Sequence, residues 1–489
     1  MPRYAITTFG CQMNVHDSER MHGVLRGAGF EAAAGPMDAD VVVLNTCSVR
    51  EKAEQKLLSE LGRLAKQKRD NPAMLVVVAG CVAQQEGERL LEHARGVDLV
   101  VGPDNIAELP ALLEELGHGS PPIARTVFDL EAPRFLTATS LASGAVTSFV
   151  TTMKGCDERC SFCIVPYTRG PERYRPSADV VAEIDGMVAR GVREVTLLGQ
   201  TVNSYRDPSS ELAAAPGASN DDPDESEFAA LLRAIAERVP ALRRLRYTSP
   251  HPRHLTPSLI AAHRDVGVLA RHVHLPVQSG SDRVLRRMIR RYTRAEYLRR
   301  VAALRAEVPG VTLSTDVIVG FPGETEADVD ETLSLLEEVG FTGVFGFKYS
   351  PRPHTPALKL GDDVPERDKA ERLARVFALS ESLLGAHLAA KVGTRQEVLV
   401  EGPAKRAFER GAEGATFTGR TAHNEIVHIV DDAAAGLVGE IVPVTIARSL
   451  KHSLVGEIDA DVRARAAAAL PPSSPSPRPP SPRALPLVR

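Results

Sequence analysis

The sequence predicts an α/β protein in three folded parts: a parallel-sheet domain, a partial (β/α)6 barrel of the TIM type, and a small C-terminal β-barrel. The chain has 489 residues, which is enough for about three domains. Short β-rich runs alternate with helix-like segments as far as residue 385, an order typical of parallel sheets covered by helices. From residue 386, short alternating runs with glycine turns indicate a small β-barrel.

The first domain is predicted from four β-rich runs, at 3–9, 40–45, 74–79 and 97–101. Helix-like mixtures of polar and apolar residues separate them, for example over 51–69 and 104–117. This order predicts a parallel sheet with helices on both faces. Residues 118–145 contain Gly, Pro and Ser and indicate a connector. We therefore place the domain and its linker at 1–140.

A second β-α series predicts the partial barrel over 141–385. Its candidate strands lie at 146–153, 193–198, 243–248, 272–277, 312–319 and 343–348. A closed barrel of eight units needs about 250 residues or more, so an open barrel fits this length better. Two helix starts support the assignment, because Thr293 with Glu296 and Thr325 with Asp328 have the spacing of a capping box.

The remaining segments differ in composition. Residues 207–226 hold six acids and no Lys or Arg, which predicts a flexible surface insertion in the barrel. The small β-barrel is placed at 386–458. The stretch 459–489 is rich in proline toward its end, and we expect a disordered tail.

Composition limits the class of protein. With 59 Lys+Arg against 63 Asp+Glu, the formal net charge is −4, which excludes a wholly basic nucleic-acid coat. Aromatic residues are 4% and Trp is absent, so extended base-stacking platforms are not expected. No stretch of 18 apolar residues and no secretory signal is present. The expected location is the cytoplasm, where thiols stay reduced.

The six cysteines all fall in the first 163 residues and form two sets of three. The first triplet is Cys11, Cys47 and Cys81, and each member follows a β-rich run. Because the carboxyl ends of parallel strands meet at one edge, these cysteines are expected to converge. The alternatives are small buried residues at strand ends and a disulfide framework, which an odd number in each set disfavours.

The second triplet, Cys156, Cys160 and Cys163, has the spacing C-x3-C-x2-C. Three thiolates within eight residues must hold one compact object. A [4Fe–4S] cluster usually takes four cysteines, so three leave one iron open for another ligand. A structural zinc site would want four protein ligands, commonly with tighter C-x2-C pairs.

This motif resembles that of the radical S-adenosylmethionine superfamily, and Phe162 matches its usual aromatic residue before the last Cys. The resemblance implies a [4Fe–4S] cluster whose open iron binds S-adenosylmethionine, which is then cleaved to a 5′-deoxyadenosyl radical. Further segments at strand ends resemble the superfamily's contacts to S-adenosylmethionine, and ordinary βα turns are the alternative for each. They are Gly199 and Gln200 near the methionine amino group, Gln278 and Ser279 near the ribose, and Gly320 and Glu324 near the adenine.

Over residues 1–458 the chain resembles the methylthiotransferases. The matching segments include FGCQMNVHDSE, LNTCSVRE, AGCVAQ, the run from 153 to 176, LPVQSGS and STDVIVGFPGET. The resemblance implies that the first triplet holds an auxiliary [4Fe–4S] cluster whose open iron carries the sulfur to be inserted. One S-adenosylmethionine would methylate that sulfur, and a second would supply the radical. The small C-terminal barrel would be the family's TRAM domain.

The segments 166–176 and 418–429 are most similar to a tRNA branch of that family. The predicted protein is an enzyme, a transferase of a sulfur-containing group. It would methylthiolate C2 of N6-isopentenyladenosine at position 37, beside the anticodon. Other branches act on threonylcarbamoyl-adenosine in tRNA or on an aspartate of a ribosomal protein. A non-catalytic iron–sulfur carrier and an RNA-binding module with structural cysteines are alternatives from other classes.

The expected partners are tRNA, a reductant such as flavodoxin or ferredoxin, and iron–sulfur assembly proteins, with the chain acting as a monomer. Residues 283–300 contain eight Arg and one Glu, a candidate phosphate contact. A solvated arginine-rich helix face is the alternative. The expected RNA contacts are Arg286, Arg287, Arg290 and Arg291, with Lys405, Arg406 and Arg420 in the small barrel.

Overall fold

The computed structural model describes the chain except residues 50, 132, 138–143, 213–221, 405–414 and 470–489. It divides into two compact units: residues 1–387 with 422–424, and residues 388–421 with 425–489. The two units are therefore described separately. None of the helices in the described part of the chain is both long and apolar enough to cross a membrane.

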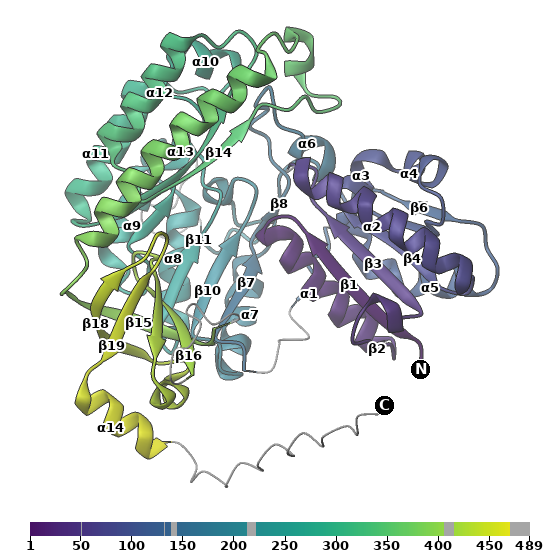
Figure 1. The fold of residues 1–489 in the computed structure, drawn as a ribbon, viewed down its shortest axis with the longest axis horizontal. Helices are drawn as coiled ribbons and strands as arrows, with labels where there is room; N and C mark the ends of the chain where they lie inside the picture. The colour runs from purple at the N-terminus through teal and green to yellow at the C-terminus, as the bar shows by residue number, and fades with distance from the viewer. Residues whose placement is uncertain (50, 132, 138–143, 213–221, 405–414, 470–489) are drawn as a thin grey trace, which may run out of the picture. The chain divides into compact units, whose positions relative to one another are not determined.

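The first unit opens with a six-stranded parallel sheet in the order β2-β1-β3-β4-β5-β6 (Figure 1). Its strands are β1 (Arg3–Phe9), β2 (Glu31–Ala32), β3 (Val41–Thr46), β4 (Leu75–Gly80), β5 (Leu99–Val101) and β6 (Ile123–Arg125). The register pairs Phe9 with Thr46 and Thr46 with Gly80. Three strands therefore end side by side, one or two residues before the members of the first triplet, as the sequence predicted.

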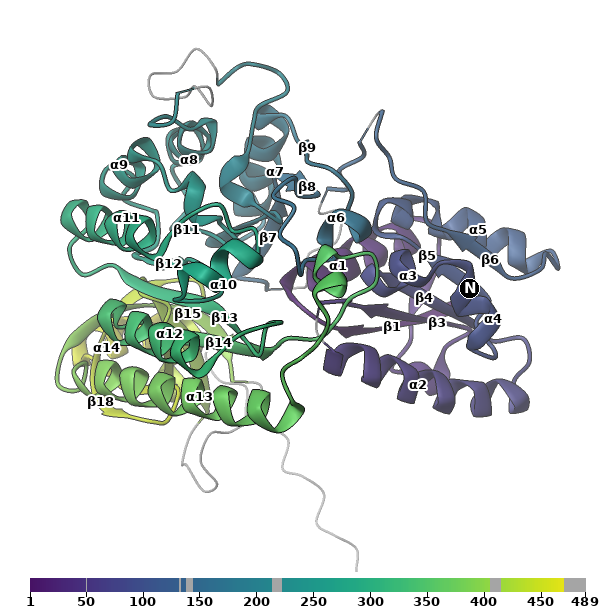
Figure 2. The ribbon, with the colours of Figure 1, turned by 90° about the horizontal axis from the view of Figure 1, so that it is seen from above.

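Helices cover both faces of this sheet (Figure 2). They are α1 (Gln12–Gly27), α2 (Glu51–Asp70), α3 (Cys81–Glu86), α4 (Glu88–His93) and α5 (Leu109–Gly117), with 3-10 turns η1 (Pro36–Asp38) and η2 (Pro103–Glu108). Alternate residues of a strand point to opposite faces. Val42 packs with Leu57 of α2, whereas Val43 packs with Met21 of α1. Apolar burial on both faces explains the almost unbroken valine runs.

The six predicted strands of the partial barrel are present. They form two parallel three-stranded sheets, joined by a parallel bridge between Leu245 and Leu269. The strands are β7 (Thr147–Thr151), β10 (Glu194–Leu198), β11 (Arg244–Tyr247), β12 (His272–His274), β13 (Thr312–Val319) and β14 (Gly343–Lys348). The covering helices are α7 (Ser177–Ala189), α8 (Glu227–Arg238), α9 (Pro257–Asp265), α11 (Arg294–Glu307), α12 (Glu326–Val339) and α13 (Glu366–Ala389). One apolar core joins strands and helices from Val150 to Val376.

Several short elements line the carboxyl ends of these strands. An antiparallel pair, β8 (Met153–Lys154) and β9 (Arg173–Tyr174), closes the base of residues 155–172, which we name the cluster loop. The others are α6 (Val165–Thr168), α10 (Asp282–Arg287), η3 (Val202–Ser204), η4 (Pro252–His254) and η5 (Pro356–Leu360). Two-residue strands carry no periodic signal, so the sequence did not predict the β8–β9 pair.

Both capping boxes are confirmed, at Thr293 before α11 and at Thr325 before α12. The first of them divides the arginine-rich segment 283–300 into α10 and α11. Between the two helices, Ile289 and Arg291 adopt left-handed φ angles of 58° and 56°. Such angles are unusual for residues with a Cβ, and for a β-branched residue they indicate a strained turn.

The two ends of the predicted flexible insertion, 207–226, are held by buried residues. Asp207 is buried and accepts a hydrogen bond from the Ser177 hydroxyl at 2.6 Å. Ser226 is also buried and caps α8. A short acidic stretch therefore contains residues that organise two barrel helices, and the central part of the prediction, 213–221, lies outside the described residues.

The second unit contains a closed five-stranded barrel in the order β15-β16-β17-β19-β18. Its strands are β15 (Arg395–Pro403), β16 (Thr416–Thr421), β17 (Ile426–Val430), β18 (Ile441–Ser449) and β19 (Leu454–Ile458). Val398, Val427 and Val444 fill its interior. The turn η6 (Asp432–Leu437) lies against α14 (Ala460–Ala469). This alanine-rich helix takes up the first residues of the expected disordered tail, because alanine has a high helix propensity.

Candidate functional site

The first triplet lies where three strands of the N-terminal sheet end. Cys11 is the N-cap of α1, Cys47 follows β3, and Cys81 begins α3. The Cys11 and Cys47 thiols are close enough for each to shift the pKa of the other, and Cys81 is close enough to interact electrostatically with both. The predicted convergence of cysteines 34 or more residues apart is therefore present in the structure.

Two glycines allow the strand ends to approach one another. Gly80 has a φ of +91°, and a Cβ there would lie 2.3 Å from Asn45 Oδ1. A Cβ on Gly10, at φ +149°, would lie 2.6 Å from the Cys47 Cβ. Any side chain at either position would push the cysteine-bearing turns apart.

Two buried asparagines, which the sequence did not single out, hold these turns together. Asn14 Oδ1 accepts hydrogen bonds from Cys11 N and from Cys11 Sγ, both at 3.3 Å. Asn45 Nδ2 donates to Asn14 O at 2.8 Å, and Asn14 Nδ2 donates to Asn45 Oδ1 at 3.2 Å. These bonds connect α1 to β3, and so connect the Cys11 turn to the Cys47 turn.

The second triplet lies in the cluster loop. Cys156 Sγ and Thr201 Oγ1 form a 2.9 Å hydrogen bond, and Cys156 N donates to Gly170 O at 3.2 Å. The loop is tightly folded, because a Cβ on Gly155 would lie 1.9 Å from Pro171 O. The three thiols are close enough to interact electrostatically with one another.

The environment of both triplets fits metal ligation. Interaction with Cys47 lowers the pKa of Cys11 to about 6, and the same interaction raises the pKa of Cys47. Burial raises the pKa of Cys81, raises that of Cys156 to about 11, and raises that of Cys163. Thiols that burial keeps protonated ionise when a metal replaces the proton. The chain has six cysteines, so each triplet can offer three ligands and no fourth cysteine.

The expected contacts to S-adenosylmethionine fall into two groups. Gly199 and Gln200 adjoin the cluster loop: a Cβ on Gly199 would lie 2.7 Å from Met153 Cγ, and Gln200 Oε1 accepts from Gly155 N at 2.5 Å. Phe162 packs on an apolar group that contains Met288 and Phe321.

The second group lies at the carboxyl ends of β12 and β13. Gln278 has a φ of 73°, and its backbone pairs with β13. The Ser279 hydroxyl lies 3.3 Å from Thr332 Oγ1 on α12. Glu324 accepts from Gly320 N at 2.5 Å and from Arg372 at 3.1 Å, and burial raises its pKa to about 7. These side chains hold the β12 and β13 ends in place.

The expected RNA contacts are corrected at one residue. Arg290 is 5% exposed and donates from Nη1 to Cys160 Sγ at 3.2 Å, from Nη2 to Pro276 O, and from Nε to Tyr292 Oη. The strained turn at 289 and 291 directs this side chain inward, so it does not belong to the RNA surface.

The other expected contacts vary in exposure. Arg286 and Arg291 are exposed, and Arg287 is half-buried with a bond to Pro322 O. Arg420 forms an ion pair with Glu401 in the small barrel at 3.1 Å. Lys405 and Arg406 lie outside the described residues.

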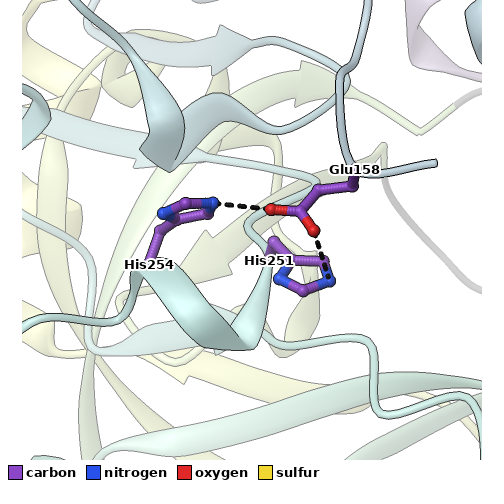
Figure 3. A group of neighbouring side chains, drawn as sticks. All are labelled: Glu158, His251 and His254. Atoms are coloured by element: carbon purple, nitrogen blue, oxygen red, sulfur yellow. Dashed lines mark hydrogen bonds and ion pairs between the residues drawn. The ribbon is translucent and has the colours of Figure 1, made fainter. Parts of the chain in front are cut away.

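Glu158 connects the cluster loop to the turn after β11. Its carboxylate oxygens lie 3.8 Å from His251 Nε2 and 2.8 Å from His254 Nε2. Figure 3 shows each ring facing one of the two oxygens. Their ligand atoms lie within 4.8 Å of one another, a spacing that suits a cation. However, Arg253 lies 3.4 Å from the same carboxylate, and the charge of Arg290 acts on His251. These positive charges oppose a cation, so the group acts as a clamp on the loop.

A second buried arginine, Arg169, contacts the first triplet. Its Nε donates to Cys81 Sγ at 3.3 Å, and its Nη2 donates to Asp17 Oδ2 at 2.6 Å. Burial alone would raise the pKa of Asp17, but Arg169 and His16 together outweigh burial and hold it at about 2. No sequence pattern indicated this contact, because Asp17 and Cys81 lie in a different domain from Arg169.

Comparisons with known proteins agree with this arrangement. Residues 3–102 match the family described as uncharacterized protein family UPF0004, and residues 150–336 match the radical SAM superfamily. The chain is 68% identical, over 95% of both chains, to a tRNA-2-methylthio-N(6)-dimethylallyladenosine synthase from Sorangium cellulosum. It is 48% identical to one from Geobacter metallireducens, over 93% of this chain and 97% of that one.

Solved structures are similar in fold. TsrM, a radical S-adenosylmethionine methyltransferase from Kitasatospora setae solved with cobalamin and a [4Fe–4S] cluster, aligns with a TM-score of 0.51 at 17% identity. The alignment covers 73% of this chain and 77% of that one. At that identity the likeness shows the fold alone. The identity to the synthases is decisive for the family, and the chain belongs to the tRNA-2-methylthio-N(6)-dimethylallyladenosine synthases of the radical SAM superfamily.

Proposed function

We propose that the chain converts N6-isopentenyladenosine at position 37 of tRNA into its 2-methylthio derivative. The observation that carries the proposal is the pair of cysteine triplets in one compact unit, in a chain 68% identical to a synthase named for this product. A carrier or electron-transfer protein would normally close each cluster with a fourth cysteine.

Each triplet would hold one [4Fe–4S] cluster: Cys156, Cys160 and Cys163 the one that binds S-adenosylmethionine, and Cys11, Cys47 and Cys81 the auxiliary one. When bound, these groups supply the radical that removes hydrogen from C2 and the methylated sulfur that replaces it. Four of the six cysteines are buried, so the protein shields both sites from water. Gln200, bonded to Gly155, fixes the cluster loop against the end of β10.

The proposal includes the partners. The substrate is tRNA, and exposed Arg286 and Arg291 are candidate phosphate contacts. A one-electron donor such as flavodoxin or ferredoxin would reduce the enzyme, and iron–sulfur assembly proteins would load it. We place the reaction in the cytoplasm, with a single chain as the active unit.

The test begins with protein purified and reconstituted without oxygen. We expect about eight irons per chain and about four after Cys11, Cys47 and Cys81 are all replaced by Ala. The reduced enzyme is then incubated with S-adenosylmethionine and isopentenylated tRNA, and the nucleosides are analysed by mass spectrometry. Product carrying one methylthio group supports the proposal. Unmodified and threonylcarbamoylated tRNA serve as substrate controls, and product only from the latter would assign a different branch.

Failure of the reduced enzyme to cleave S-adenosylmethionine, with about eight irons present, would contradict the proposal and favour an iron–sulfur carrier. An iron count of about four that the Ala replacements leave unchanged would remove the sulfur source, and with it the insertion reaction.

A further inference from the structure

One residue of the cluster loop reaches across to the other triplet. Arg169 follows α6, six residues after Cys163, and its side chain is 6% exposed. Its guanidinium contacts Cys81 Sγ and Asp17, as described above, and α6 packs against α3, the helix that Cys81 begins. The loop that carries the second triplet therefore also supplies the side chain that touches the first.

The backbone beside Arg169 is bound just as closely to the second triplet. Cys156 N donates to Gly170 O, and the Arg169 carbonyl accepts from Arg173 at the base of the loop. A displacement of residues 169–170 would therefore move Cys156 and release Cys81 at the same time.

We propose that Arg169 is a positioning residue for the auxiliary site, which sets the charge at the Cys81 sulfur and fixes that site to the cluster loop. This inference rests on the proposed function, because that function gives the first triplet a cluster to hold. Asp17 completes the arrangement. It lies on α1, whose N-cap is Cys11, so the carboxylate and one ligand belong to the same helix.

The electrostatic consequence follows from the pairing. Hydrogen bonds and positive charge at a ligand sulfur make a cluster easier to reduce. At Cys81 the donor is retained, but the carboxylate of Asp17 opposes the charge of Arg169. At Cys160 the donor is Arg290, which the Glu158 carboxylate influences electrostatically without an ion pair between them in the described part of the chain. The two triplets thus have similar donors, and the donor to Cys81 is the one held in a direct ion pair.

The chain offers a matched control. Arg20, also on α1, donates to Glu183 of α7 at 2.9 Å, and both side chains are 3% exposed. This pair joins the same two domains and is as buried as the pair of Arg169 and Asp17, but it touches no cysteine, and Glu183 keeps a second partner in Arg175. Arg20→Met therefore reports the effect of removing a buried arginine between the domains that contacts no cysteine.

The experiment is an EPR-monitored redox titration of the reconstituted full-length chain. It is repeated in a Cys156→Ala, Cys160→Ala, Cys163→Ala background, where only the auxiliary cluster contributes. We expect Arg169→Met to make the midpoint potential of that cluster more negative and Asp17→Asn to make it more positive. Arg169→Lys, which keeps the charge, should lie closer to the unchanged protein. Arg20→Met, which removes a charge that acts on Asp17 but contacts no cysteine, should shift the potential much less than Arg169→Met.

Shifts of the same sign in Arg169→Met and Asp17→Asn, or an equal shift in Arg20→Met, would overturn the proposal and leave a structural ion pair. If Arg169→Met does not hold its iron, the test rests on Asp17→Asn and Arg169→Lys. A more positive midpoint potential in Asp17→Asn supports the proposal, and an unchanged potential overturns it.

A second readout uses turnover. Arg169→Met should still cleave S-adenosylmethionine, while the methylthio product formed per cleavage falls about 10- to 100-fold, the usual cost of a misplaced reacting group. An unchanged product yield would overturn the positioning role. If the unchanged protein makes no product at all, the proposed function fails, and the redox titration still tests the contact of Arg169 with the auxiliary site.

Discussion

Single buried side chains make the stability of this protein sensitive to acid, and His263 illustrates why. It lies on α9 and forms a 2.7 Å hydrogen bond with Tyr247 at the end of β11. Burial lowers the pKa of His263 from 6.5 to about 4. Between these values the unfolded chain binds a proton that the folded chain does not, so stability must fall as the pH falls.

We expect His263→Gln, which keeps a hydrogen-bonding group beside Tyr247 but does not titrate, to remove this dependence. From pH 6.5 down to about 4, the unchanged protein should lose about 3 kcal/mol more unfolding free energy than the variant. Urea unfolding at a series of pH values measures the difference. Parallel stability curves for the two proteins would show that His263 titrates normally.

At the same scale, the sequence predicted some site residues and not others. The six cysteines were found because three follow predicted strands and three share a short motif. Asn14, Asn45 and Arg169 were missed, because their partners are brought close only by the folded chain. Arg290 was assigned to RNA from its neighbours in sequence, and the left-handed turn that directs it inward left no pattern in those residues.

At the scale of elements, α10 and the turn after it carry the arginines whose contribution to tRNA binding should be measured. With Arg290 buried, the exposed candidates are Arg286 and Arg291. Replacing both by Ala should weaken tRNA binding, and the slope of log K against log salt should fall by about 1 per lost phosphate contact. Arg89→Ala, on α4 with a 69% exposed side chain, is the control for a general loss of charge. An unchanged slope would leave these arginines as a solvated surface.

The longer helices and strands were predictable from the sequence. All six barrel strands and both capping boxes were found, because period and cap chemistry are local signals. The β8–β9 pair, α6 and the break between α10 and α11 were not. Each spans only a few residues, and the contacts that fix it come from distant parts of the chain.

For the whole molecule, the two triplets predict a division of labour that variants can separate. Replacing any of Cys156, Cys160 and Cys163 by Ala should abolish reductive cleavage of S-adenosylmethionine. Replacing any of Cys11, Cys47 and Cys81 should spare cleavage and stop methylthiolation, because the triplets are built on separate sheets. Both products are measured in one reaction by liquid chromatography. Loss of cleavage in the second set, in protein that remains folded, would show that the two sites do not work independently.

The fold class and the order of the three parts were predicted from the alternation of strands and helices. The contacts between the first two parts were not, since Asp17 pairs with Arg169, and Arg20 with Glu183, across more than 150 positions of sequence. The sequence around one residue of such a pair does not indicate where its partner lies.

The proximity of the Cys11 and Cys47 thiols affects how the protein reacts with oxygen. Two thiols this close need only lose two electrons and two protons to become a disulfide. Protein that has lost the proposed auxiliary cluster in air would thus carry a disulfide between Cys11 and Cys47, with oxygen as the oxidant. Iron and sulfide alone would not restore it, and a thiol reductant would have to open the bond first.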